Sequence, residues 1–118
     1  MSDSMRPPGK TTIAPDVLIT IARLATLGIR GVNRMAKLPP NVNRIFKANI
    51  ADGVEITVEN NTVYADLYVI LLRDVNVREV CKAIQSQVAR SISEMVGMEV
   101  GQVNVHVENI EYSPESGA

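Results

Sequence analysis

The segment from Gly53 to Leu72 reads GVEITVENNTVYADLYVILL, and it constrains the fold more than any other part of the chain. Apolar and polar residues alternate along it, which is the pattern of half-buried β-strands. Asn60 and Asn61 interrupt the alternation, and asparagine tolerates the positive φ angles of a two-residue hairpin turn. The segment therefore predicts a β-hairpin, so the chain has to build a sheet.

The return strand of this hairpin has apolar residues on both of its faces. One face carries Val63, Ala65, Leu67, Val69 and Leu71, and the other carries Tyr64, Asp66, Tyr68, Ile70 and Leu72. The second face is more apolar than a solvated surface requires, so we expect part of this chain or another copy to cover it. Its candidate interaction residues are Tyr64, Tyr68, Ile70 and Leu72.

A helix and a further strand follow the hairpin. Asn76 and Glu79 have the spacing of a capping box, and Gly97 is suited to end the helix. The apolar stripe between them consists of Val77, Val80, Cys81, Ile84, Val88, Ile92 and Met95. Val103, Val105 and Val107 then alternate with polar residues as in a strand. Because Ile110 and Tyr112 fall on the polar side of this alternation, we expect a bulge or a strand end near Glu108.

The part of the chain before the hairpin predicts a strand and a helix. Residues 10–14, KTTIA, can form a short strand. Pro15 and Asp16 favour a helix start, and apolar residues at 17, 18, 21, 24, 25 and 29 have helical spacing. Gly28 and Gly31 end or bend this helix. Residues 41–50, NVNRIFKANI, fit either a short second helix or a loop.

These elements predict a single α+β domain with the order βαββαβ. Two main helices would lie on one face of a small mixed or antiparallel sheet, in a split βαβ arrangement. Residues 1–8 are assigned to a disordered N-terminal tail, residues 9–113 to the domain and residues 114–118 to a C-terminal tail. The pattern leaves the order of the strands in the sheet open.

Charge divides the chain into a basic and an acidic part, although the net charge is only −1. Residues 17–51 contain no acidic residue, whereas residues 52–118 contain eleven acidic and four basic residues. The division indicates an anionic partner for the basic part, head-to-tail attraction between copies, or a mixed solvated surface. The basic residues of the first part are Arg23, Arg30, Arg34, Lys37, Arg44 and Lys47.

Composition excludes several classes of protein. A single cysteine allows neither an internal disulfide nor a cysteine-based zinc site. No apolar run approaches the roughly 20 residues that a membrane-spanning helix needs. The start, MSDSMRPPGKTT, lacks the apolar stretch of a secretory signal. We therefore expect a cytoplasmic protein that needs no metal and no cofactor.

No residue set for catalysis emerges from the motifs. His106 is the only histidine, and the alternation places it on the polar face between Asn104 and Glu108, which favours a structural or solvent-facing role. Cys81 falls in an apolar stripe, where cysteine behaves as a small hydrophobe. The stretch SMRPPGKT ends like a phosphate-binding loop but has Ser4 where that loop needs its first glycine. We expect that the protein is not an enzyme.

The alternative function is nucleic-acid binding through the basic segment 23–47. Its GIRG turn, residues 28–31, has the G-x-x-G spacing with which KH domains clamp nucleic-acid backbone. The sequence pI of about 5.8, however, is far below that of a typical nucleic-acid-binding domain. A helix stop followed by a turn is the favoured interpretation of GIRG.

The order and spacing of several segments resemble the alkaline shock protein family, the envelope stress response proteins of Gram-positive and related bacteria. GKTTIAPDVLITIARLA resembles the family's opening, GIRGVNRM its V-x-G-V-x-x-M segment, and VYADLYVIL its V-x-V-D-L-Y-I-V strand. Residues 75–107 resemble its long helix, its M-T-G-L-x-V turn and its closing V-N-V-x-V strand. The resemblance covers residues 9–110. Arg73-Asp74, where the family often has Tyr-Gly, and the basic segment 33–52 depart from it.

The resemblance implies a non-enzymatic cytoplasmic scaffold or adaptor in the envelope or alkaline stress response. Members of the family are thought to self-associate and to lie against the inner membrane through a small membrane-anchored partner. We accordingly expect a homo-oligomer that is peripheral at the inner face of the membrane and does not insert into it. The contacts would use the apolar sheet face or a sheet edge, together with attraction between the two charged parts. Nucleic acid is not the expected partner.

Overall fold

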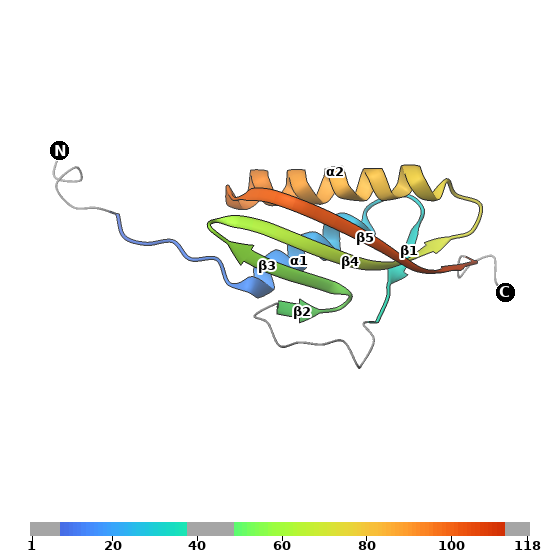
Figure 1. Ribbon diagram of the computed structural model, residues 1–118, viewed down its shortest axis with the longest axis horizontal. Coiled ribbons are helices and arrows are strands. Elements are labelled where there is room, and N and C mark those ends of the chain that lie inside the picture. The colour runs from blue at the N-terminus through green and yellow to red at the C-terminus, as the bar shows by residue number, and fades with distance from the viewer. Residues whose placement is uncertain (1–7, 38–48, 113–118) are drawn as a thin grey trace.

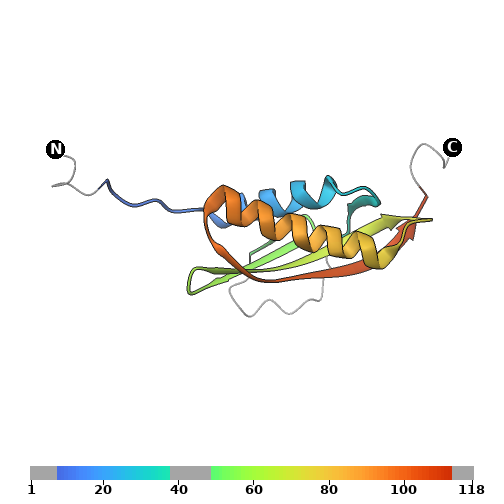
Figure 2. The same ribbon diagram turned by 90° about the horizontal axis from the view of Figure 1, so that it is seen from above.

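The computed structural model describes residues 8–37 and 49–112, in which two helices pack on one face of a five-stranded sheet (Figures 1 and 2). In chain order the elements are α1 (Pro15–Leu27), β1 (Val32–Met35), β2 (Asn49–Ala51), β3 (Val54–Glu59), β4 (Thr62–Leu72), α2 (Val77–Val96) and β5 (Glu99–Glu111). The predicted α+β class, with both helices on one face, is confirmed.

The sheet is built around β4. β3 pairs antiparallel with residues 62–67 of β4, and β1 pairs antiparallel with residues 69–71. β5 pairs in parallel along β4 from Thr62 to Leu72, so β1 and β3 must share the opposite edge of β4. β2 pairs with the outer edge of β3. The sheet is therefore mixed, which is one of the two predicted forms.

Short elements before the hairpin differ from the expectation. Residues 10–14 form no strand: Ile13 packs against the core, but no neighbouring strand takes the backbone hydrogen bonds of this segment. A strand precedes the hairpin in another place: β1 follows α1 and has four residues. β2 occupies residues 49–51, whereas residues 41–48 of the expected short helix or loop lie outside the described part. Strands of three or four residues are too short to display an alternation.

The turn and the caps that the sequence predicts are confirmed. Asn60 and Asn61 adopt φ angles of 50° and 62°, as a two-residue hairpin turn between β3 and β4 requires. The side-chain oxygen of Asn76 accepts a hydrogen bond of 3.0 Å from the backbone N–H of Glu79 at the start of α2. Gly97 ends α2 in the left-handed conformation, with a φ of 73°.

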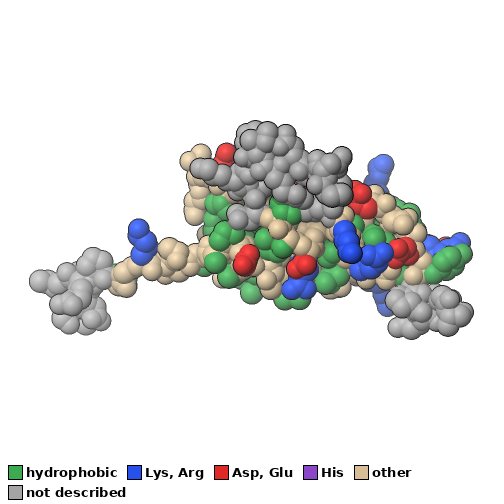
Figure 3. All heavy atoms as spheres, turned by 90° about the horizontal axis from the view of Figure 1, so that it is seen from below, with side chains coloured by type: hydrophobic (Ala, Val, Ile, Leu, Met, Phe, Trp, Pro, Cys, Tyr) green, Lys and Arg blue, Asp and Glu red, His purple; other side chains and the backbone are tan. Residues whose placement is uncertain are grey.

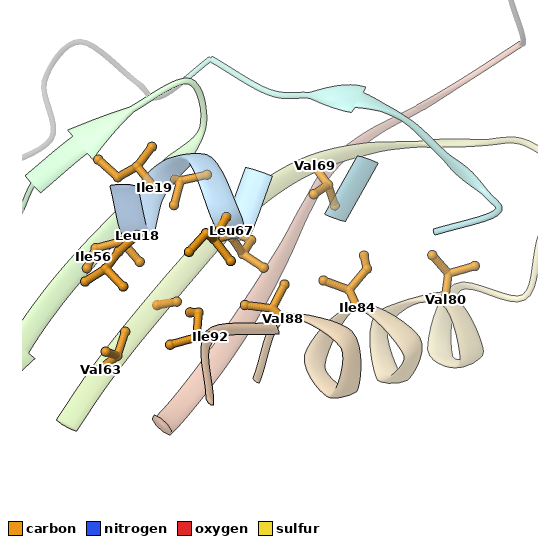
Figure 4. Close-up of a cluster of buried hydrophobic side chains, with 14 of the residues drawn as sticks. Leu18, Ile19, Ile56, Val63, Leu67, Val69, Val80, Ile84, Val88 and Ile92 are labelled. Carbon is orange, nitrogen blue, oxygen red and sulfur yellow. The ribbon is translucent and has the colours of Figure 1, made fainter. Parts of the chain in front are cut away.

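The core lies between the sheet and the two helices (Figure 4). All of the residues predicted for the inner face of β4, which are Val63, Ala65, Leu67, Val69 and Leu71, are fully buried. They meet Leu18, Ile19 and Ala22 of α1 and Val80, Ile84, Val88 and Ile92 of α2. The predicted stripe of α2 was too wide, since Val77 and Met95 at its two ends are 38% and 69% exposed. The buried contact of α2 with the core is made by four residues, each four positions after the last: Val80, Ile84, Val88 and Ile92.

Two bulges in β5 change which residues face the core. Val69 pairs with Val107 and Ile70 with Asn109, so Glu108 is an extra residue at the position where the sequence predicts a bulge. A second irregularity falls at Gly101, between the pairs Val63–Val100 and Tyr64–Gln102. The bulges allow one long strand to follow the twist of β4 with its valines turned inward.

Candidate functional site

The face of the sheet opposite the helices is the candidate interaction site. We call it the open face, and define it by Tyr64, Asp66, Tyr68 and Leu72 of β4 with Asn104 and His106 of β5. The four β4 residues and His106 are half-buried. In the described part of the chain, both helices lie on the other side of the sheet (Figure 2), and no helix or strand covers this face.

A polar cluster at the centre of the open face joins β4 to β5. Nε2 of His106 lies 2.9 Å from Oδ1 of Asp66, and Nδ2 of Asn104 donates to the same oxygen at 3.2 Å. The imidazole stacks on the ring of Tyr68, with centroids 4.5 Å apart and an angle of 15° between the planes. The parallel register produces these contacts, because Tyr68 stands opposite His106 and Asp66 stands opposite Asn104. The cluster therefore holds Tyr68 in one orientation on the open face.

The Asp66–His106 pair has only part of what nucleophilic catalysis requires. A carboxylate that orients an imidazole activates a nucleophile only when a hydroxyl or thiol lies within hydrogen-bond reach of the ring. Among residues 8–37 and 49–112, the side chain that bonds His106 is the Asp66 carboxylate, and no group of three His, Cys, Asp or Glu could hold a metal ion. His106 lies on the polar side of its strand, as the alternation predicts, with 41% of its side chain exposed.

One of the predicted interaction residues is not available at the surface. Ile70 is only 6% exposed, whereas Tyr64, Tyr68 and Leu72 stay half-buried at the surface. β1 and β5 flank β4 on opposite sides, and the side chains of Arg34 and Glu111 meet across it next to Ile70. Alternation gives the face on which a residue lies and does not give its burial. The interaction role of Ile70 stays a prediction, for a side chain that is buried within this chain.

Glu111 receives three hydrogen bonds from β1. Arg34 donates to its two carboxylate oxygens from Nε at 3.3 Å and from Nη2 at 2.8 Å, and Nδ2 of Asn33 donates at 2.9 Å. The Arg34 hydrogen bonds above all, and then the charge of Arg34 and the bond from Asn33, hold the pKa of Glu111 below its ordinary value, although desolvation acts in the opposite direction. The end of β5 is thereby fastened across the sheet to β1.

The basic segment is partly neutralised within the chain. Besides the Arg34–Glu111 pair, Nε of Arg23 lies 3.9 Å from the Asp52 carboxylate. Arg30 and Lys37 are exposed, and Arg44 and Lys47 lie outside the described residues. On the side seen in Figure 3, lysine and arginine side chains stand beside acidic ones instead of forming one uninterrupted patch. Two of the six basic residues of this segment, Arg23 and Arg34, thus have acidic partners within the chain.

The GIRG turn is a helix stop that packs inside the protein. Gly28 caps α1, and its N–H donates to the carbonyl of Leu24 at 3.1 Å. Gly31 has a φ of +106°, and a Cβ there would lie 2.8 Å from Cγ2 of Val80 and 3.4 Å from Cγ1 of Val75. A buried glycine against the first turn of α2 serves close packing. The favoured interpretation of this turn is confirmed.

Cys81 has the environment of an unreactive thiol. It lies in the first turns of α2 and is half-buried. Burial raises the pKa of its thiol above the ordinary value, because desolvation disfavours the charged thiolate. The thiolate is the reactive form of cysteine, so this position suits a packing role.

β5 gives the sheet a long edge. Nε2 of Gln85 donates to the carbonyl oxygen of Val103 at 3.1 Å, so this carbonyl points away from β4. The backbone groups of Val105 and Val107 follow by alternation and also point outward. In the described part of the chain β5 has only β4 beside it. Charged residues and bulges hinder the pairing of such an edge with a strand of another chain. β5 has both, in its two bulges and in Glu99, Glu108 and Glu111.

Part of the site was not accessible to sequence reasoning. The Asp66–His106 contact joins residues 40 positions apart, and it depends on the parallel register of β4 and β5. The sequence did signal that each residue lies on the polar face of its own strand. It did not show that the two strands are neighbours, because α2 separates them.

No helix of the described residues is long and apolar enough to cross a membrane.

The chain is similar to one protein family and to several bacterial proteins. The model of the alkaline shock protein 23 family, which is described as having a cell envelope-related function, matches residues 4–112. The uncharacterized protein Spy1535 of Streptococcus pyogenes is 35% identical over 105 residues, which are 86% of this chain and 79% of that protein. In Bacillus subtilis, the uncharacterized protein YqhY is 24% identical over 110 residues, covering 92% of this chain and 82% of YqhY. YloU of the same organism is 24% identical over 106 residues, covering 86% of this chain and 88% of YloU. No solved structure matches the chain.

Proposed function

The chain belongs to the alkaline shock protein 23 family, as the resemblance of its segments predicts, and from this premise we propose that it is a non-enzymatic scaffold of the cell envelope. In this role it self-associates and binds a small membrane-anchored protein, which holds it at the cytoplasmic face of the membrane. The family's function is cell envelope-related.

The observation that supports this role most directly is that large aromatic and apolar side chains share the open face with its polar cluster. Tyr64, Tyr68 and Leu72 present half-buried side chains on a side of the sheet that carries no helix among the described residues. Tyrosine offers a large contact area with one polar tip, which is why it is enriched at protein interfaces. The stack on His106 holds the Tyr68 ring, so little side-chain entropy remains to be lost when a partner binds.

The chemistry of the remaining polar groups also fits a binding protein. The His106 imidazole is bonded to a carboxylate and stacked on an aromatic ring, and the Cys81 thiol has a raised pKa. Both groups are engaged in ways that stabilise the fold. Electrostatic attraction between copies at this contact falls to exposed cations such as Lys37, facing exposed carboxylates such as Glu99 and Glu108. Such solvent-exposed attraction weakens as salt screens it.

The test of self-association is molar mass by size-exclusion chromatography with light scattering, across protein concentration at low and high salt. We expect a mass that rises with concentration and falls with salt. Tyr68→Asp should lower the mass, because it places a charge in the contact. Ser86→Asp is the matched control, since it adds the same charge at an exposed position of α2 on the other side of the sheet, and it should leave the mass unchanged. A wild-type chain that stays monomeric throughout would refute self-association.

The membrane-anchored partner is tested separately. Cells of the organism that naturally makes this protein are broken and separated into membrane and soluble fractions. We expect the chain in the membrane pellet and its release by an alkaline carbonate wash that leaves integral membrane proteins behind. Complete recovery in the supernatant before the wash would contradict this part of the proposal.

A further inference from the structure

α1 is more apolar on its outer side than a surface helix needs to be. Its sequence, PDVLITIARLATL, has only Asp16 and Arg23 as charged residues. A helix that is apolar around most of its circumference is normally buried on all sides. Here the side opposite the core stays in contact with solvent, where Val17 is 44%, Leu24 57% and Leu27 39% exposed. Three large apolar side chains on one helix therefore lack a cover among the described residues.

The exposed residues have the spacing of a coiled-coil seam. Val17, Thr20, Leu24 and Leu27 follow one another at intervals of three, four and three residues, which is the a–d pattern of a heptad repeat. With Val17 and Leu24 as a positions, the buried residues Leu18, Ile19, Ile21 and Ala22 occupy b, c, e and f. The a, d and g positions then form one continuous strip that faces away from the core. We call this strip the α1 seam.

The g position along the α1 seam is occupied by charged residues. Asp16 and Arg23 follow one another at an interval of seven, and Arg30 lies in the turn just after the helix, beyond the residues that the heptad pattern places. Asp16 and Arg30 are exposed, whereas Arg23 has the Asp52 carboxylate at 3.9 Å. Charges at the margin of such a seam set the partner and its direction.

From this pattern we infer that the α1 seam docks on the α1 seam of a second copy, with the two helices antiparallel. In antiparallel pairs each a residue faces a d residue, so Val17 of one copy meets Leu27 of the other. Thr20 meets Leu24 in the same way on each side of a two-fold axis. One surface then serves both copies, as a closed two-fold dimer requires.

The charges favour the antiparallel direction. In that pairing Asp16, at the start of α1 in one copy, lies at the end of α1 in the other copy, where the exposed Arg30 follows in the turn. The two Arg23 side chains meet at the two-fold axis, where each already has its own Asp52 as counter-ion. In a parallel pair the g residues would instead face e positions, which are Ile21 and Gly28, and no opposite charges would meet. Opposite helix dipoles also favour the antiparallel pair.

This contact rests on the self-association proposed above and specifies one of its interfaces. Three apolar side chains per copy bury much less surface than the roughly 1,200–2,000 Å² that stable complexes bury. The dimer should therefore dissociate on dilution. The seam and the open face lie on opposite sides of the sheet (Figure 2), so both contacts can form on one copy. A closed contact at α1 and a second contact at the open face would then link copies into larger assemblies.

The experiment is sedimentation velocity of the full chain over a range of concentrations. Leu24→Asp should weaken dimerisation about tenfold or more, because it places a charge at the centre of the seam. Met95→Asp is the matched control, since Met95 is an even more exposed apolar residue on the other helix, at 69%. Far-ultraviolet circular dichroism and urea unfolding establish that both variants fold. If Leu24→Asp and Met95→Asp have equal effects, the inference is overturned.

A charge exchange tests the direction of the pair. Asp16→Arg or Arg30→Asp alone should weaken the dimer about two- to fivefold, because each sets like charges side by side at both ends. The double variant restores opposite charges and should bring the dissociation constant back to within about twofold of wild type. Single effects that simply multiply in the double variant would exclude the antiparallel seam.

The two interfaces can be told apart. Loss of mass with Tyr68→Asp but not with Leu24→Asp would overturn the α1 seam and leave the proposed function standing. Loss with Leu24→Asp but not with Tyr68→Asp would support the seam and remove the open face as a self-contact. A monomeric wild-type chain would refute both.

Discussion

His106 and Asp66 meet across neighbouring parallel strands, with Nε2 of the imidazole 2.9 Å from Oδ1 of the carboxylate. Their side chains are 41% and 31% exposed, so water screens the interaction. We expect a coupling free energy of about 0.5–1 kcal/mol, as for other partly exposed pairs. A double-mutant cycle of Asp66→Ala and His106→Ala, measured by urea unfolding, gives this number. The same cycle with Ser86→Ala on α2 in place of His106→Ala should give a coupling near zero.

Replacing Gly31 by alanine should lower the stability of the fold more than the same replacement at Gly97 does. Alanine at a positive φ costs about 1 kcal/mol of stability, and at Gly31 the added Cβ also meets Val80 at 2.8 Å. We expect Gly31→Ala to lower the free energy of unfolding by about 1–3 kcal/mol more than Gly97→Ala does. Gly97 is the matched control, because its φ is +73° and nothing lies within 4 Å of its Cβ position. Equal losses would show that Val80 and Val75 move aside at no cost.

Glu111 should make stability depend on pH in the acid range. Its pKa in the folded state is lowered, chiefly by the Arg34 hydrogen bonds. The carboxylate therefore stabilises the fold at every pH above the ordinary glutamate pKa, and this contribution is lost as pH falls through the lowered value. Urea unfolding of wild type and Glu111→Gln should show a constant difference near neutral pH that shrinks in acid. In an Arg34→Ala background, the Glu111→Gln substitution should make a smaller pH-dependent difference.

The Cys81 thiol should react slowly in the folded protein. Burial raises its pKa, so a smaller fraction is thiolate at a given pH than in the unfolded chain. Alkylation by iodoacetamide, followed by mass spectrometry, should be slower in buffer than in urea at the same pH. The midpoint of its pH profile should lie above that of a free cysteine. A folded protein that reacts as fast as the unfolded chain would contradict this assignment.

Sequence patterns predicted the elements that carry their own signals. The Asn60–Asn61 turn, the inward face of β4 and the Asn76 cap of α2 each depend on residues close together in the chain, and each is present. β1 and β2 have four and three residues and therefore carry no periodic signal. They form because β1 pairs with β4 and β2 pairs with β3. These pairings depend on residues elsewhere in the chain and not on a local pattern.

The open face was predicted as a surface and not as a set of contacts. Alternation placed Tyr64, Tyr68, Ile70 and Leu72 on one face, and they share it. It could not show that Ile70 is buried, nor that Arg34 and Glu111, 77 residues apart, form an ion pair. The interaction roles of this face and of the exposed cations Arg30 and Lys37 stay predictions. Arg44 and Lys47 lie outside the described residues.

The parallel pairing of β5 with β4 also has a consequence for the time during which the protein is made. β4 leaves the ribosome before α2 and β5, and translation adds about 5–20 residues per second. For a few seconds the strand with the largest share of the core, Thr62–Leu72, has an open edge on the side where β5 later pairs. An open apolar edge recruits other chains. We therefore expect the nascent chain to be most prone to aggregate in the interval before Glu99–Glu111 can pair with β4.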